Sequence, residues 1–223
     1  MGGLAAQADS LTLSGGEELD LGSTVNVYDG ERSFFGSQIH DWLLEGNSAE
    51  SMEKVLVEEN VFPSQTTYAK EVSQLASEVL KSGKVYQVRA AANDTYYQGL
   101  VISLSVSESQ QKKLAVYQKA ALENKENSDS DALVSTLLTA CQNKIEVKSH
   151  SDWKEKKGAS GKTYRTGDVQ LSLKQNGFVL PLYMKGIIMQ EEGKTTYTLL
   201  AGDQVSGQYL APFFDKALQG AMK

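Results

Sequence analysis

Alternating apolar and polar positions dominate two parts of the chain and predict β-strands there. The first part comprises residues 84–92 and 96–107, separated by Asn93-Asp94. The second comprises residues 146–150, 162–174, 178–190 and 194–201, with Asn176-Gly177 between two of these runs. A period of two places every second side chain on one face of a sheet, and Asn-Gly between such runs is a strong hairpin signal. The pattern therefore predicts an antiparallel sheet built from hairpins.

Apolar residues at helical spacing predict helices on both sides of these strands. The clearest helix covers residues 64–82, where Pro63 precedes the apolar stripe and Gly83 follows it. Two short helices fit residues 37–57, further helices are expected over residues 108–123 and 131–144, and a last helix carries Pro212 in its first turn. The side chains expected to be buried on these stripes are Tyr68, Val72, Leu75, Val79, Leu133, Leu137, Leu138, Phe213, Phe214 and Leu218.

The N-terminal part of the chain is punctuated by glycine and serine. Residues 9–22 are therefore expected to form a flexible lead-in that is loosely held. Residues 24–28 alternate before Asp29-Gly30, so they are expected to pair with residues 32–35 as a hairpin. The whole pattern predicts an α+β fold, with an antiparallel β-sheet packed by helices in a single domain over residues 23–223.

The first eight residues are small or apolar and end in Ala6-Gln7-Ala8, before Asp9. This A-x-A pattern is typical of a signal-peptidase site, so residues 1–8 are interpreted as the residual tail of a signal peptide. We therefore expect an extracytoplasmic protein, which is periplasmic, part of the cell envelope or secreted. The alternative is a flexible Ala/Gly terminus of a cytosolic protein.

The composition excludes several classes of partner and chemistry. A formal net charge of -6 and a pI near 5.1 disfavour nucleic acid as a partner, because polyanions are repelled. No apolar stretch is long enough to predict a transmembrane segment. Cys141 is the only cysteine, so no internal disulfide or thiolate metal cluster can form, and it fits the apolar stripe of a helix.

One segment has the opposite charge to the rest of the chain. Between Lys144 and Arg165 there are seven basic and three acidic residues. With interleaved aromatic residues, this segment is a candidate site for an unknown protein, a glycan or a small anionic ligand. The candidate ligand-binding residues are Trp153, Lys154, Lys156, Lys157 and Tyr164. The alternative is a solvated hairpin whose lysines protect the edge of the sheet.

No catalytic motif is complete, and neither a cofactor nor a metal site is predicted. The run from Gly158 to Thr163 ends like a phosphate-binding loop, but Lys156 stands where that motif requires its first glycine. A basic hairpin tip is the better interpretation. The alternative to a binding protein is an extracytoplasmic hydrolase that uses His150 and Asp152 with a serine from elsewhere, because these groups are close in sequence. His40 is interpreted as a surface or boundary histidine.

The C-terminal part of the chain, residues 145–222, resembles the end of the PsbP-like α/β/α sandwich. The likeness rests on the strand Tyr197-Thr198-Leu199-Leu200-Ala201, followed by a helix with the paired anchors Tyr209-Leu210 and Phe213-Phe214. Members of that family are often exported binding or accessory proteins without catalysis. The resemblance therefore implies an exported, non-catalytic binding or accessory protein, which agrees with the missing catalytic motifs.

Overall fold

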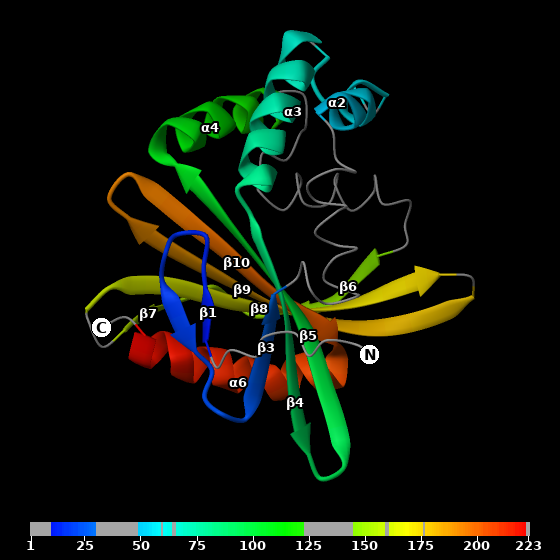
Figure 1. Ribbon diagram of the computed structural model, residues 1–223. Helices are drawn as coiled ribbons and strands as arrows, with labels where there is room; N and C mark the ends of the chain where they lie inside the picture. The colour runs from blue at the N-terminus through cyan, green and yellow to red at the C-terminus, as the bar shows by residue number, and fades with distance from the viewer. Residues whose placement is uncertain are drawn as a thin grey trace, which may run out of the picture.

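The computed structural model describes residues 10–29, 49–58, 60–63, 66–122, 145–158, 161–175 and 177–221. Its main feature is an antiparallel sheet with the strand order β3-β4-β5-β10-β9-β8-β6, in which β7 also pairs with β8 (Figure 1). The strands are β3 (Val25–Asp29), β4 (Lys84–Ala92), β5 (Thr95–Ser107), β6 (Ile145–His150), β7 (Lys154–Lys157), β8 (Thr163–Gln175), β9 (Phe178–Glu191) and β10 (Lys194–Asp203). Together with the helices, this sheet confirms the predicted α+β fold.

The hairpins predicted between residues 84–92 and 96–107, and between residues 162–174 and 178–190, are present. Strands β4 and β5 meet at Asn93 and Asp94, which both have the positive φ that Asn and Asp tolerate best among residues with a side chain. Gly177, in the turn between β8 and β9, has a φ of 81°. The turn residues thus fix the register that pairs β8 with β9, and a substitution of Gly177 would strain the backbone.

Helix α6 (Gln204–Ala221) lies across one face of the sheet (Figure 1). Its side chains Leu210, Phe214 and Leu218 are fully buried against residues of β5, β9 and β10. Tyr97 of β5 stacks on Tyr209 with ring centroids 3.8 Å apart. The expected burial of Phe214 and Leu218 is confirmed, while Phe213 is only partly buried at the margin of the same core.

The segment expected to be a flexible lead-in belongs to this core, so that prediction is wrong. Residues 10–21 include the short hairpin of β1 (Ser10–Thr12) and β2 (Glu18–Asp20), which packs on the same side of the sheet as α6. Its four leucines, which are between 0 and 4% exposed, are Leu11, Leu13, Leu19 and Leu21. The hairpin is tied to the sheet because the Ser14 amide donates a hydrogen bond of 3.0 Å to Ser103 Oγ.

The position of Pro212 also differs from the prediction. Helix α6 begins at Gln204, so Pro212 lies inside the helix and not in its first turn. The earlier start is explained by Asp203, whose Oδ1 accepts hydrogen bonds from the amides of Val205 and Ser206. This is an N-cap, which satisfies amides that have no partner within the helix. Pro212 is exposed, so water can solvate the carbonyl that its missing N–H leaves free.

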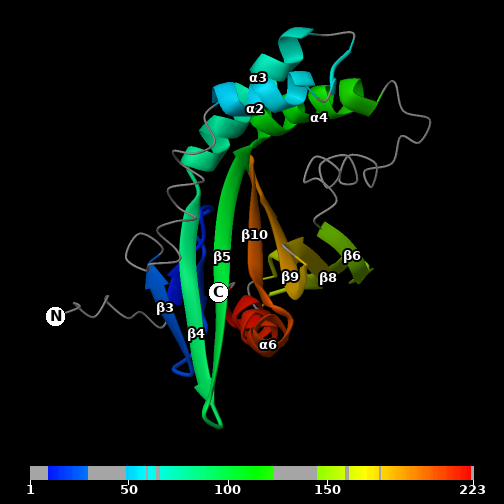
Figure 2. The same cartoon turned by 90° about the vertical axis from the view of Figure 1, so that its right-hand side faces the viewer.

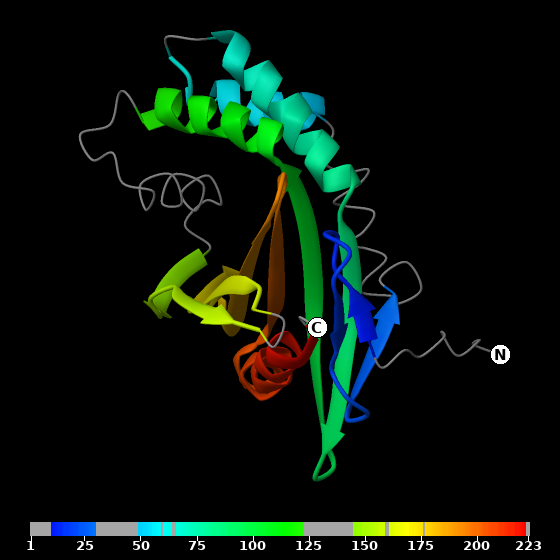
Figure 3. The ribbon, with the colours of Figure 1, turned by 90° about the vertical axis from the view of Figure 1, so that its left-hand side faces the viewer.

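Three helices gather at the end of the sheet where β4 begins and β5 ends (Figures 2 and 3). They are α2 (Ala49–Glu58), α3 (Thr66–Lys81) and α4 (Glu108–Leu122), and they share a small core of their own. Leu75 and Val79 are buried as expected, and Tyr68 and Val72 are partly buried. Tyr68 of α3 contacts Tyr117 of α4 and Phe62, in the connection between α2 and α3, edge to face.

Several predictions fall on residues outside the described ranges. These are the signal-peptide tail of residues 1–8, the strand at residues 32–35, the helix at residues 131–144 with Leu133, Leu137, Leu138 and Cys141, and His40. Within the described ranges, no helix has the length and apolar character needed to cross a membrane.

Candidate functional site

The basic segment forms a hairpin, as its sequence predicted. Lys154 to Lys157 make strand β7, which pairs with Thr163 to Thr166 of β8. The link between the strands is closed by a hydrogen bond of 2.9 Å from the Gly158 amide to the Lys162 carbonyl. A strand follows this link, so the segment lacks the helix whose N-terminal amides hold the phosphates in a phosphate-binding loop.

The predicted ligand-binding residues of this hairpin do not form one surface. Lys156 points toward α6, where its Nζ lies 3.4 Å from Asp215 Oδ1. Trp153 lies on the other face of the sheet, because it covers Gly186 of β9. Tyr164 is 1% exposed and belongs to the core, so it cannot contact a ligand on the surface. Lys154 and Lys157 are exposed, but alternation along β7 directs them to opposite faces.

Behind the hairpin, a polar cluster joins the sheet to α6. Lys185 of β9 has a side chain that is only 3% exposed, and its Nζ lies 3.2 Å from both Asp168 Oδ1 and Asp215 Oδ1. The Tyr183 hydroxyl donates a hydrogen bond to Asp168. Burial raises the pKa of Tyr183 and the hydrogen bond to Asp168 raises it further. With Lys156, the cluster balances two cations against two carboxylates, which allows the Lys185 charge to be buried.

The groups of the alternative hydrolase are not brought together. His150 and Asp152 are both exposed, and within the described residues neither makes an ion pair or a side-chain hydrogen bond. The hydroxyl of Ser151 accepts a hydrogen bond of 2.9 Å from the Asp168 amide. Ser151 thus fastens the end of β6 to β8, which is a structural role.

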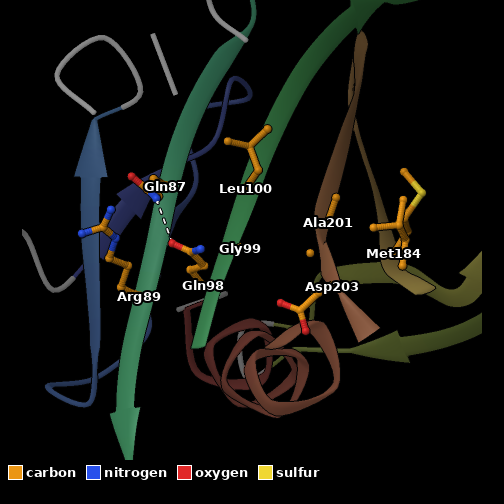
Figure 4. Close-up of a pocket in the computed structure, with 10 residues that line it drawn as sticks. Gln87, Arg89, Gln98, Gly99, Leu100, Met184, Ala201 and Asp203 are labelled. Atoms are coloured by element: carbon orange, nitrogen blue, oxygen red, sulfur yellow. Dashed lines mark hydrogen bonds between the residues drawn. The ribbon is translucent and has the colours of Figure 1, made fainter. Parts of the chain in front are cut away.

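A cavity of about 520 Å³ lies on the face of the sheet opposite to α6, which we call the second face (Figure 4). It spans four adjacent strands and has an apolar floor. The lining side chains are Leu100 of β5, Leu182 and Met184 of β9, Ala201 of β10, and the polar residues Gln87, Arg89, Gln98 and Asp203. The strand register explains why these side chains lie together. Gln87 pairs with Leu100, Leu100 with Ala201, and Ala201 with Met184. Directly paired residues of antiparallel strands share a face.

The polar side chains of this cavity lie at its margins. Gln87 is 6% exposed, and its Nε2 is 3.5 Å from Gln98 Oε1, a long contact that leaves the Gln98 amide available to a ligand. The guanidinium of Arg89 lies over the Tyr28 ring, 5.4 Å from its centroid. Figure 4 shows this guanidinium turned toward β3, whereas the Asp203 carboxylate faces the cavity. The cavity therefore combines an apolar floor with a carboxylate and an amide.

Sequence reasoning missed this cavity because its lining comes from strands distant in the chain. The alternation that predicted each strand also placed Leu100 and Met184 on one face of their own strands, but it could not reveal that both faces of the sheet carry apolar side chains. One local signal was available: Asp203 ends a strand and directly precedes a helix, a position that predicts an N-cap. Among the described residues there is no cluster of histidine, cysteine and carboxylate side chains that could hold a metal ion.

No protein-family model matches the chain, and no curated protein matches it. Among solved structures, it is similar to a Pseudomonas aeruginosa protein of unknown function that is described as a candidate regulator. The two are 9% identical in sequence, and the superposition covers 60% of this chain and 79% of the other with a TM-score of 0.33.

Proposed function

We propose that this is an exported, non-catalytic binding or accessory protein, and that it holds a small amphipathic molecule in the cavity on the second face. The observation that carries the proposal is the cavity itself. Its volume of about 520 Å³ falls within the range of roughly 300 to 1,000 Å³ that is typical of small-molecule sites. Leu100, Leu182 and Met184 supply apolar contact area, while Asp203 and Gln98 can orient the ligand.

The proposed site lies on the face of the sheet that α6 does not cover. Phe214 and Leu218 are fully buried between α6 and the sheet, so a ligand has no room there, and the hollow on this side lies further out, between α6 and the N-terminal hairpin. On the second face, Leu100 and Met184 keep part of their surface exposed. An apolar ligand would remove that surface from water, and about 25 cal/mol is gained per Å² of apolar surface that is buried.

Export is part of the proposal and rests on the Ala6-Gln7-Ala8 pattern and on the PsbP-like resemblance of the C-terminal part. The measurement is N-terminal sequencing of the protein isolated from its native host. We expect the mature chain to begin at Asp9. Protein that retains residues 2–8 would contradict export but would leave the binding site untouched.

Two other functions have less support. Of the three lysines predicted for an anion site on the basic hairpin, only Lys154 and Lys157 would be available, because Lys156 is paired with Asp215, and the predicted Tyr164 is buried. A hydrolase would need His150 to reach a carboxylate and a hydroxyl, and His150 contacts neither among the described residues. The cavity is therefore the site to test first.

The binding site is tested with Nile red, an uncharged apolar dye whose fluorescence increases out of water. We expect the dye to bind the unmodified protein, and Ala201→Trp to weaken binding at least tenfold because the indole fills the cavity. Ala115→Trp is the matched control, since Ala115 is exposed on α4, outside the cavity. Equal dye binding by both variants, or no binding by the unmodified protein, would contradict the proposed site.

A further inference from the structure

We propose that the ligand of this cavity is an amphipathic amine, whose protonated nitrogen is held by Asp203 and whose apolar body lies on Leu100, Leu182 and Met184. This inference rests on the proposed function, because it names the chemical class of ligand for the same cavity.

Asp203 is fixed in place with its charge directed at the cavity. It is the last residue of β10, and its Oδ1 accepts hydrogen bonds of 3.1 and 3.0 Å from the amides of Val205 and Ser206. These backbone bonds do not use Oδ2. Burial alone would raise the pKa of Asp203, but the hydrogen bonds from Ser206 and Val205 outweigh it and lower the pKa. The carboxylate is therefore charged at neutral pH.

The cation nearest to Asp203 in the cavity lining does not neutralise it. Among the described residues, Arg89 is the only basic residue of the lining, and its guanidinium lies over Tyr28, on the side of β4 away from Asp203 (Figure 4). Within the described parts of the chain, Asp203 makes no ion pair. The edge of the cavity at β10 is therefore negative, which favours a cationic ligand group and disfavours a carboxylate.

In the cavity, the polar Asp203 and the apolar side chains lie side by side, so a ligand that contacts both must be amphipathic. Asp203 pairs with Leu182 across β10 and β9, and Ala201 pairs with Met184 one step further along the same face. An ammonium group at Asp203 thus has apolar floor immediately beside it. Gln98, on the neighbouring strand β5, offers an amide to a second polar group of the ligand.

The inference is tested with three probes of equal chain length, below the concentrations at which they form micelles: dodecylamine, dodecanoate and dodecanol. Their displacement of Nile red, and their heats of binding by calorimetry, give the affinities. We expect dodecylamine to bind at least tenfold more tightly than dodecanol, and dodecanoate to bind least tightly. Because Asp203 is exposed, the preference for the amine should decrease with added salt.

The decisive variant is Asp203→Asn. Asparagine is as good an N-cap as aspartate, so α6 keeps its first turn while the negative charge is lost. We expect this variant to bind dodecylamine no better than dodecanol. Asp94→Asn is the matched control, because Asp94 is exposed in the turn between β4 and β5 and its φ of 59° suits asparagine.

The outcomes separate this inference from the proposed function. If Nile red binds and Ala201→Trp prevents binding, but the amine shows no preference or keeps it in Asp203→Asn, the cavity is a binding site and the amine assignment is wrong. If dodecanoate binds most tightly, Arg89 and not Asp203 selects the ligand, and the inference is overturned. If neither the dye nor any probe binds, the proposed function and the inference fail together.

Discussion

Gly186 lies directly beneath the indole of Trp153. A Cβ placed at residue 186 would be 2.7 Å from Cη2 of Trp153, and one placed at Gly167, its partner on β8, would be 3.2 Å from Cδ2. The two paired glycines therefore form a flat surface on which the indole packs, and Trp153 remains 48% exposed. This close approach of the indole explains why both strands have a glycine at these positions, although glycine in a strand otherwise weakens packing.

Gly186→Ala is expected to displace Trp153 and to lower the free energy of unfolding by about 1 to 3 kcal/mol, because the added methyl group cannot fit under the ring. Chemical denaturation measures the stability, and tryptophan fluorescence in a Trp42→Phe background reports the indole of Trp153. Gly220→Ala is the control. Nothing lies within 4 Å of a Cβ at Gly220 in α6, so that change should be neutral or stabilising. Equal stability of the two variants would contradict the close packing of Trp153 on Gly186.

Leu19→Ala is expected to destabilise the protein by about 2 to 5 kcal/mol, since Leu19 is 0% exposed in the core beneath the N-terminal hairpin. Urea unfolding followed by circular dichroism is the measurement. Val205→Ala, at a position that is 65% exposed, should change the unfolding midpoint little. A midpoint for Leu19→Ala that matches the unmodified protein would mean that residues 10–21 are loosely held after all.

The raised pKa of Tyr183 predicts a loss of stability in alkali. Burial and the hydrogen bond to Asp168 raise the pKa of Tyr183 above its ordinary value of 10.0, so the unfolded chain releases this proton before the folded protein does. The stabilisation is therefore complete below about pH 10 and is lost as the pH rises above it. Urea unfolding between pH 8 and 11 measures the slope.

Tyr183→Phe should make that slope shallower, because the titrating group is gone. The control is Tyr96→Phe, at a tyrosine that is 83% exposed, which should keep the slope of the unmodified protein. Identical slopes for all three proteins would show that Tyr183 does not carry the effect.

Phe214→Ala is expected to cost about 3 to 5 kcal/mol, because the ring is fully buried between α6 and the sheet. Phe178→Ala removes the same ring from a position that is 73% exposed at the start of β9, so it should cost far less. Denaturation of the two variants side by side compares them. Similar losses would mean that the buried face of α6 has been assigned wrongly.

Local patterns were sufficient for much of the fold. The expected strand at residues 84–92 matches β4, and the helix expected over residues 64–82 is α3 at Thr66–Lys81. These elements have strong periodicity and clear boundaries, such as Gly83 between α3 and β4. In each case the residues that define the element are also those that bury its apolar face, so local sequence and tertiary packing agree.

The remaining errors arise where distant contacts decide the structure. Glycine and serine in residues 10–21 suggested a loose segment, but two strands of three residues each bury their leucines because α6 and the sheet provide the other wall of the core. Lys185 alternates into the core, and its buried charge is tolerated because Asp168 of β8 and Asp215 of α6 both pair with it. Likewise, Trp153 and Tyr164 were grouped by sequence proximity, although the sheet separates them.

The outer edge of β8 pairs with two short strands, β6 and β7, instead of one long strand. The pairing of β6 shifts register between Val147 and Ser149, and residues 151–153 interrupt the edge before β7 begins. A strand from a second molecule would meet only short, offset runs of free amides and carbonyls, flanked by exposed lysines such as Lys154. Edge-to-edge growth into fibrils or insoluble aggregates is thereby discouraged on this side of the sheet.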